Sequence, residues 1–225
     1  MASTDKLFEL YKQHESVIFE VGSRCSGEME GPFLIAPNDV YWNAHTKVVF
    51  VGQETYGWSS EDDIASQMQT YSRFNLGEAY YSSPFWNVIR KFETALTGNT
   101  FSSAWLNINR YDQGGARPSW SNQCILSELD FLLFEELKLL SPDIVIFFTG
   151  PHYDKRIIDL MEATFSPVNN LTLRQLGNIH SEKINTAIFR TYHPKYLRLS
   201  GLEEKVIEEI CAVAANRASG NQYKE

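Results

Sequence analysis

Cysteine is scarce in this chain: its 225 residues include three, Cys25, Cys124 and Cys211, and they lie far apart. No two of them have the CxxC spacing of a redox site. The set is also too scattered for a disulfide framework or for a closed zinc or iron–sulfur site. We therefore interpret the three cysteines as free thiols in a reducing cytosol.

Long hydrophobic runs are absent as well, since no stretch approaches the length of a membrane span. The first residues, Met1 to Lys6, lack the basic start and the apolar core of a secretory signal. We expect a cytoplasmic protein with no membrane partner.

Positive charge is in deficit, because 20 Lys and Arg residues stand against 28 Asp and Glu residues, for a net charge of −8. Proteins that bind phosphates usually show a basic surface. The charge therefore counts against nucleic acid as a partner, although it does not exclude a local basic face.

Apolar strands and amphipathic helices alternate along the whole chain, and its length favours a single domain over residues 1–225, which we expect to be a monomer. The pattern predicts strands at Lys47–Val51, Ala104–Ile108, Asp143–Thr149 and Ala187–Tyr192. It predicts helices at Thr4–Phe19, Pro84–Leu96, Asn122–Leu140, Tyr153–Thr164 and Leu202–Arg217. This order predicts an α/β fold, a three-layer α/β/α sandwich with a central four-stranded parallel sheet.

A long polar and aromatic connection, Ser59 to Ser83, interrupts this alternation, with a short helix expected at Ile64–Met68. A connection of that length inside a compact domain is usually functional or disordered. An aromatic side chain in it, such as Phe74, could stack on a flat ligand or pack into the core.

Two short polar segments each follow an apolar strand: Gly52–Trp58 after the first and His193–Leu197 after the last. Ligands of open α/β sheets bind beyond the carboxyl ends of the strands, so the segments can meet in one cleft. There Glu54 could orient a water molecule and His193 could stabilise a leaving anion. The alternatives are a surface turn whose Glu54 caps the next helix and a histidine that bonds a neighbouring loop.

Asn107 and Asn109 have the same parity, so both lie on one side of the second predicted strand. An amide has both donors and an acceptor, which suits recognition of the Watson–Crick edge of a base. The alternative is that they are turn residues at the end of a strand, and we prefer this for Asn109.

Taken together, Gly-Gln-carboxylate-x-Tyr after the first strand, Asn at the second and His-Pro-x-x-Leu after the last resemble the uracil-DNA glycosylase superfamily. The resemblance spans Lys47 to about Arg217. It implies that the protein has the fold of that superfamily. It also implies that the protein is a DNA glycosylase, which flips uracil or a related damaged base out of DNA and hydrolyses the N-glycosidic bond of that base. It also implies that the enzyme needs no metal and no cofactor.

The resemblance assigns catalytic roles to two residues: Glu54 would orient the water and His193 would stabilise the departing uracil anion. Gln53 would offer its backbone to the pyrimidine. Tyr56 would crowd the C5 position of the base and exclude a methyl group. Asn107 would be the amide that reads uracil.

Three more residues receive roles from the same resemblance. Phe74 would stack on the base, and Leu197 would be the wedge that fills the gap left by the flipped nucleotide. Lys195 could contact a DNA phosphate.

The first motif departs from the best-studied branch of the superfamily, which has Asp, Pro and His where Glu54, Thr55 and Gly57 stand. Tyr196, in the last motif, also differs. The extra methylene of Glu54 relative to Asp displaces the carboxylate by about a bond length, and such a displacement can lower a rate by ~100-fold. With the acidic composition, these departures motivate an alternative: a fold relative that binds a base, nucleoside or modified nucleotide without excising it from DNA. A third reading is an interaction module that uses the loop Ser59 to Ser83.

Overall fold

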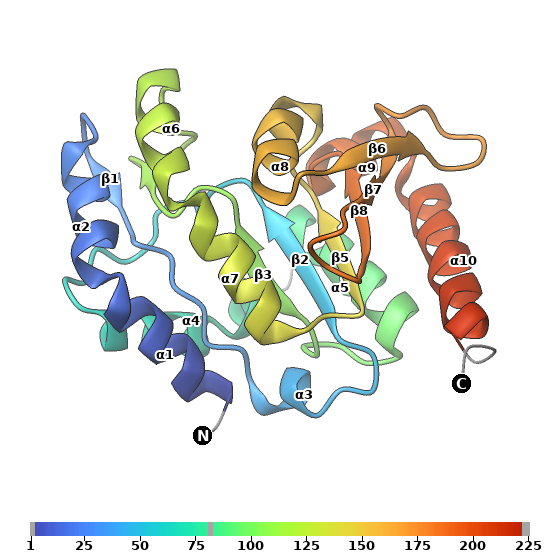
Figure 1. Ribbon diagram of the computed structural model, residues 1–225, viewed down its shortest axis with the longest axis horizontal. Helices are drawn as coiled ribbons and strands as arrows, with labels where there is room; N and C mark the ends of the chain where they lie inside the picture. The colour runs from blue at the N-terminus through green and yellow to red at the C-terminus, as the bar shows by residue number, and fades with distance from the viewer. Residues whose placement is uncertain (1–2, 81–82, 222–225) are drawn as a thin grey trace.

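The computed structural model describes residues 3–80 and 83–221, and these residues form an α/β structure of three layers. A six-stranded sheet lies in the middle layer. Helices α7 (Asp130–Leu140) and α8 (Asp154–Met161) cover one face, and α5 (Pro84–Thr97) and α10 (Glu203–Asn221) cover the other (Figure 1). The predicted sandwich of helices on both sides of a sheet is therefore confirmed.

The central sheet is mixed, with strand order β3-β2-β5-β8-β7-β6. Its strands are β2 (Val48–Gly52), β3 (Ala104–Asn107), β5 (Ile144–Phe147), β6 (Thr164–Pro167), β7 (Leu176–His180) and β8 (Ala187–Thr191). A separate antiparallel pair joins β1 (Met29–Glu30) to β4 (Asp112–Gln113).

The prediction of four parallel strands is correct for β3, β2, β5 and β8, but the prediction that they make up the whole sheet is wrong. Strands β7 and β6 extend the sheet in antiparallel pairing. Both lie toward an edge, and β6 has no buried residue. Antiparallel edge strands tolerate water on one face, so they lack the continuous apolar run that revealed the buried parallel strands.

Among the remaining helices, those at Asp39–Trp42 and Pro194–Ser200 were not predicted, and the others differ from the prediction in their limits. The remaining helices are α1 (Ser3–Gln13), α2 (Glu15–Arg24), α3 (Asp39–Trp42), α4 (Ile64–Phe74), α6 (Trp120–Leu126) and α9 (Pro194–Ser200). Short 3-10 turns cover Asn75–Tyr80, Ser127–Leu129 and Pro151–Tyr153.

Two of the predicted helices are broken in the structure. The first divides at His14, and the helix predicted at Asn122–Leu140 divides at the turn Ser127–Leu129. In each case the buried stripe continues across the break, with Leu7 and Ile18 on the two sides of the first one. A pattern of buried positions therefore could not reveal the interruption.

The register of the parallel strands places their carboxyl ends at one edge of the sheet. Gly52 of β2 is paired with Asn107 of β3, and Val51 is paired with Phe147 of β5. The β2 side chains are all buried, as expected when helices cover both faces of a parallel strand. The segments that follow β2, β3, β5 and β8 therefore emerge together.

A buried ion pair fixes the chain just beyond this edge. Arg110 donates to both carboxylate oxygens of Glu136 on α7, at 2.9 and 2.5 Å, and Tyr11 of α1 donates to the same carboxylate at 2.5 Å. All three side chains are buried. Because Arg110 is used in the core, it is not one of the basic groups that could face a ligand.

None of the helices in the described residues is both long enough and apolar enough to cross a membrane.

Candidate active site

The carboxyl end of β2 approaches β3 closely. A Cβ atom at Gly52 would lie 2.3 Å from the Oδ1 of Asn107, so only glycine leaves room for the Asn107 side chain. Asn107 is buried, and its Oδ1 accepts a hydrogen bond from the indole nitrogen of Trp105 at 3.1 Å. This bond fixes which end of the amide is oxygen and which is nitrogen.

The Asn107 amide nitrogen has no hydrogen-bond partner within the described part of the chain. Leaving a buried donor unsatisfied costs about 1–3 kcal/mol. A ligand with an acceptor oxygen at this point would remove that cost. Asn107 therefore has the property expected of a residue that reads a carbonyl group.

Glu54, two residues beyond Gly52, is held by donors from three other segments. Its Oε2 accepts from the amide nitrogen of Asn109 at 3.1 Å and from the hydroxyl of Tyr153 at 3.2 Å, and its Oε1 lies 3.7 Å from the Nε of Arg117. The side chain is 12% exposed. Burial raises the pKa of Glu54, and the bonds from Asn109, Arg117 and Tyr153 oppose this rise.

Asn109 presents its amide nitrogen to Glu54 because its oxygen is already engaged. The Oδ1 accepts from Arg156 of α8 at 2.6 Å, and the Nε of Arg156 donates to Asp130 of α7 at 2.9 Å. The Asn109 side chain is fully buried. Asn109 thus lies just beyond the end of β3, as we preferred for this residue, and its side chain also bonds Glu54.

His193 stands at the start of α9 and caps that helix. Its Nδ1 accepts from the backbone N–H of Lys195 at 3.3 Å, and its ring lies 5.4 Å from the ring of Phe85 on α5. Burial, with the nearby charges of Arg117 and Lys195, lowers the pKa of His193 to about 4. The imidazole is therefore neutral at pH 7, and because Nδ1 accepts, its proton is on Nε2.

Arg117 connects the two candidate catalytic residues. Its guanidinium donates to the side-chain oxygen of Gln53, faces Glu54 and lies over the ring of Tyr153 at 5.7 Å, while its charge lowers the pKa of His193. Glu54 and His193 therefore lie at the same edge of the sheet, since each is three residues beyond one of the aligned positions Val51 and Arg190. The sequence did not reveal Arg117, because it lies in an irregular connection after β4, where no strand or helix pattern fixes its direction.

Asp112 of β4 shapes the loop that follows Glu54. One carboxylate oxygen accepts from the hydroxyl of Thr55 at 2.6 Å and from the backbone N–H groups of Gly57 and Trp58 at 3.1 Å each. The other accepts from the N–H of Gly115 at 2.8 Å, two residues before Arg117. A single buried carboxylate thus ties together the loops that carry Glu54 and Arg117.

Gln53 lies within this network, since its side-chain nitrogen donates to the backbone oxygen of Thr149 at 2.8 Å. Tyr56 does not pack into it: this side chain is 91% exposed. Lys195 is exposed at the start of α9.

Two predicted roles do not fit the packing. Leu197 is fully buried, so it lacks the exposure that a wedge needs, whereas Leu199 on the same helix is 76% exposed. Phe74 packs in an aromatic cluster, with its ring 5.4 Å from that of Trp105, and the ring against His193 is Phe85 instead.

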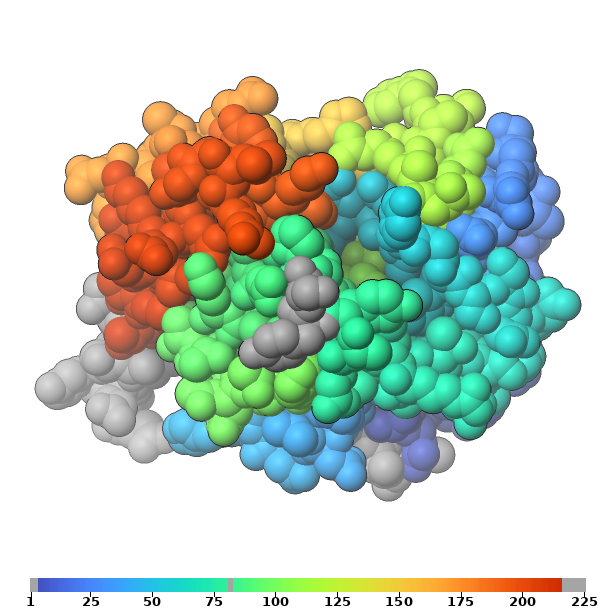
Figure 2. Space-filling model, turned by 180° about the vertical axis from the view of Figure 1, so that it is seen from behind, coloured from blue at the N-terminus to red at the C-terminus, as the bar shows by residue number. Residues whose placement is uncertain are grey.

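The surface is hollowed where these segments meet. Figure 2 shows the hollow between the orange-red atoms of α9, the green atoms at the start of α5 and the blue atoms of the segment that follows β2. Within the residues that the structure describes, no group of three or more His, Cys, Asp or Glu side chains is arranged to hold a metal ion.

Comparison of the sequence with protein-family models and with curated proteins found no match. The relationship to the uracil-DNA glycosylase superfamily therefore stays a prediction from the motifs and from the arrangement of the site.

Proposed function

We propose that this protein is a DNA glycosylase that hydrolyses the N-glycosidic bond of uracil or a related damaged base. The observation that carries the proposal is that Glu54, a neutral His193 and the Asn107 amide nitrogen, which has no partner in the described part of the chain, all lie where parallel strands end at one edge of the sheet. A carboxylate and a neutral donor on either side of one site are the groups that such a cleavage needs.

Each group has a defined task in this reaction. The bond between the sugar C1′ and the base breaks, its electron pair leaves with the base, and the Nε2–H of His193 donates to a base oxygen on which negative charge develops. Glu54 stabilises the positive charge on the sugar and accepts a proton from the water whose oxygen bonds to C1′. The buried position of both groups strengthens these interactions.

Asn107 supports uracil as the base. Its amide nitrogen is a donor, and uracil has an acceptor oxygen at the position where cytosine has an amino group. A donor opposite the amino group of cytosine would leave two donors facing each other. The site therefore favours a base with a carbonyl group at this position.

The test is a single-turnover assay of base release from single- and double-stranded oligonucleotides that contain uracil or other damaged bases. Wild type should release base, and Glu54→Gln and His193→Ala should each lower the rate by about 100-fold or more. Glu61→Gln and His180→Ala, both at exposed positions, are matched controls and should retain the wild-type rate. Equal rates for wild type and both site variants on every substrate would refute the catalytic assignment.

A second candidate is a protein that binds a base, nucleoside or modified nucleotide without excising it. The ion pair between Arg117 and Glu54 favours it, because a guanidinium at the carboxylate competes with a water molecule for the same oxygen. Titration of labelled DNA over a salt series separates the two functions. Affinity for DNA that falls steeply with salt, with release of base, supports the glycosylase. Affinity for a free nucleoside with no base release supports the second candidate.

A further inference from the structure

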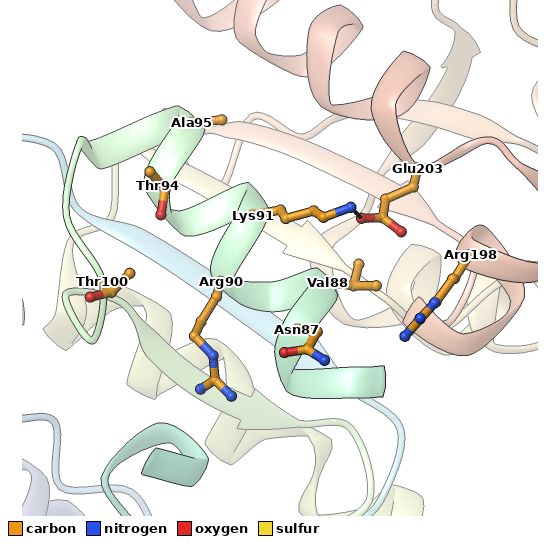
Figure 3. A pocket seen from close by; sticks show the side chains of 9 residues that line it. All are labelled: Asn87, Val88, Arg90, Lys91, Thr94, Ala95, Thr100, Arg198 and Glu203. Carbon is orange, nitrogen blue, oxygen red and sulfur yellow. Dashed lines mark ion pairs between the residues drawn. The ribbon is translucent and has the colours of Figure 1, made fainter. Parts of the chain in front are cut away.

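A groove with a largely apolar lining and a few charged side chains runs along the helices behind the sheet. It has a volume of about 710 Å³ and lies between α5, α9 and the start of α10. Figure 3 shows its charged lining: Arg90 and Lys91 of α5, Arg198 of α9 and Glu203 of α10. Asn87 and Thr94 add neutral polar groups to the lining.

The charged lining is basic, although the chain as a whole carries a net charge of −8. Lys91 pairs with Glu203 at 2.5 Å, and Arg90 points away from this pair (Figure 3). Arg90 is 7% exposed and its guanidinium lies over the ring of Phe101 at 5.5 Å. Arg198 extends from α9 toward α5 (Figure 3). Lys91 and Arg198 are thus the exposed cations of this groove, with the charge that phosphate groups require.

Helices α5 and α9, which line the groove, pack on each other and both begin at the candidate active site. Phe85, in the first turn of α5, contacts His193 at the start of α9. At about 1.5 Å per residue, Lys91 lies about 9 Å along α5 from Phe85, and Arg198 lies about 7.5 Å along α9 from His193. A strand with one phosphate per about 3.4 Å of axis covers such a distance with two or three phosphates.

We propose that this groove binds the phosphates of the single nucleic-acid strand that flanks the base in the active site. Arg198 and Lys91 contact the phosphates directly, Arg90 supplies fixed positive charge from below, and Lys195 extends the path toward His193. This inference rests on the proposed function, because it takes the strand to be the one whose base lies beside Glu54.

The experiment titrates full-length protein with a short labelled single-stranded oligonucleotide over a range of salt concentrations. The groove variant Lys91→Gln/Arg198→Gln should bind about tenfold more weakly than wild type. The slope of log affinity against log salt should shrink by about 1.4, because each phosphate contact to a single strand contributes about 0.7. Glu203→Gln removes the opposing carboxylate and should bind more tightly than wild type.

The control variant is Lys155→Gln/Arg24→Gln. Like the groove variant it removes one lysine and one arginine, here from exposed ion pairs on α8 and α2. It should keep both the affinity and the salt slope of wild type. Equal behaviour of the groove and control variants would overturn the proposal, as would a wild-type protein that does not bind the oligonucleotide.

Competition distinguishes a strand from a small anion. Inorganic phosphate should displace the labelled strand only weakly. Displacement at a stoichiometric concentration of phosphate would show that the groove binds a free anion and would overturn the proposal that it binds a strand. The inference and the proposed function can fail separately. If binding depends on the groove but no base is released, only the proposed glycosylase function is refuted. If base is released but the groove variant binds as well as wild type, only the proposed role of the groove is refuted.

Discussion

Asn109 donates its amide nitrogen to the Oε2 of Glu54 at 3.1 Å, and Arg156 holds the amide in the orientation that makes this possible. The bond stabilises the carboxylate form of Glu54 and opposes the effect of burial, which raises the pKa of this group. Asn109 therefore tunes the proposed base as well as positioning it.

Replacing Asn109 with Ala should move the acidic limb of the pH profile of kcat/KM to higher pH. Without the bond the pKa of Glu54 rises further, so a higher pH is needed to keep it ionised. The rate at the plateau should fall by about tenfold, as expected for a hydrogen bond to a charged group. A profile that loses amplitude without a change in its midpoint would show that Asn109 does not act on Glu54.

Replacing Asn107 with Asp tests the reading of the base. Aspartate keeps the oxygen that accepts from Trp105 but removes the amide donor. Uracil release should fall by about 5- to 150-fold, corresponding to about 1–3 kcal/mol for a lost base contact, and release of cytosine should rise relative to uracil. The preference between the two bases is measured by competition in one reaction. If it is unchanged, Asn107 does not take part in recognising the base.

The neutral state of His193 predicts a pH dependence of stability. Its pKa is lowered to about 4 in the folded protein, chiefly by burial, against an ordinary value of about 6.5. As pH falls from about 6.5 to about 4, the unfolded chain takes up a proton that the folded protein does not. The folded state should therefore lose up to about 3 kcal/mol over this range from this group.

Comparison with His193→Gln isolates this contribution, because glutamine does not titrate. The free energy of unfolding of wild type minus that of the variant, from urea denaturation, should decrease between neutral and acid pH. A difference that stays constant would mean that His193 has the same pKa in the folded protein as in the unfolded chain.

The sequence predicted the parallel part of the sheet because Val48, Ile144 and their neighbours form continuous apolar runs. A strand buried on both faces leaves that signature, and β6 and β7 at the edge do not. The placement of Glu54 and His193 at one edge followed from the same reasoning, since parallel strands end together.

The partners of Glu54 were harder to predict. Arg117 lies in an irregular connection, and Tyr153 follows a turn after β5, so neither position is fixed by a repeating pattern. The wrong role for Leu197 has a similar cause. The motif fixed its place in the chain, but only the packing of α9 decides that Leu197 faces the core and Leu199 faces the solvent.

Replacing Asp112 should affect the loop that carries Glu54 and the loop that carries Arg117 at once. The Asp112 carboxylate accepts four hydrogen bonds, from Thr55, Gly57, Trp58 and Gly115. In Asp112→Asn, one acceptor oxygen becomes an amide nitrogen that points its hydrogens at donors. We expect the free energy of unfolding to fall by about 2–3 kcal/mol and the rate of base release to fall by more than tenfold.

The matched control for this variant is Asp159→Asn, since Asp159 has a single exposed ion pair with Lys155 on α8. Surface pairs contribute about 0–1 kcal/mol, so both stability and rate should stay close to wild type. Single-turnover rates measured well below the unfolding midpoint of each variant separate misplacement of the loops from loss of folded protein. If Asp112→Asn is destabilised but releases base at the wild-type rate, then Asp112 stabilises the fold without positioning Glu54 or Arg117.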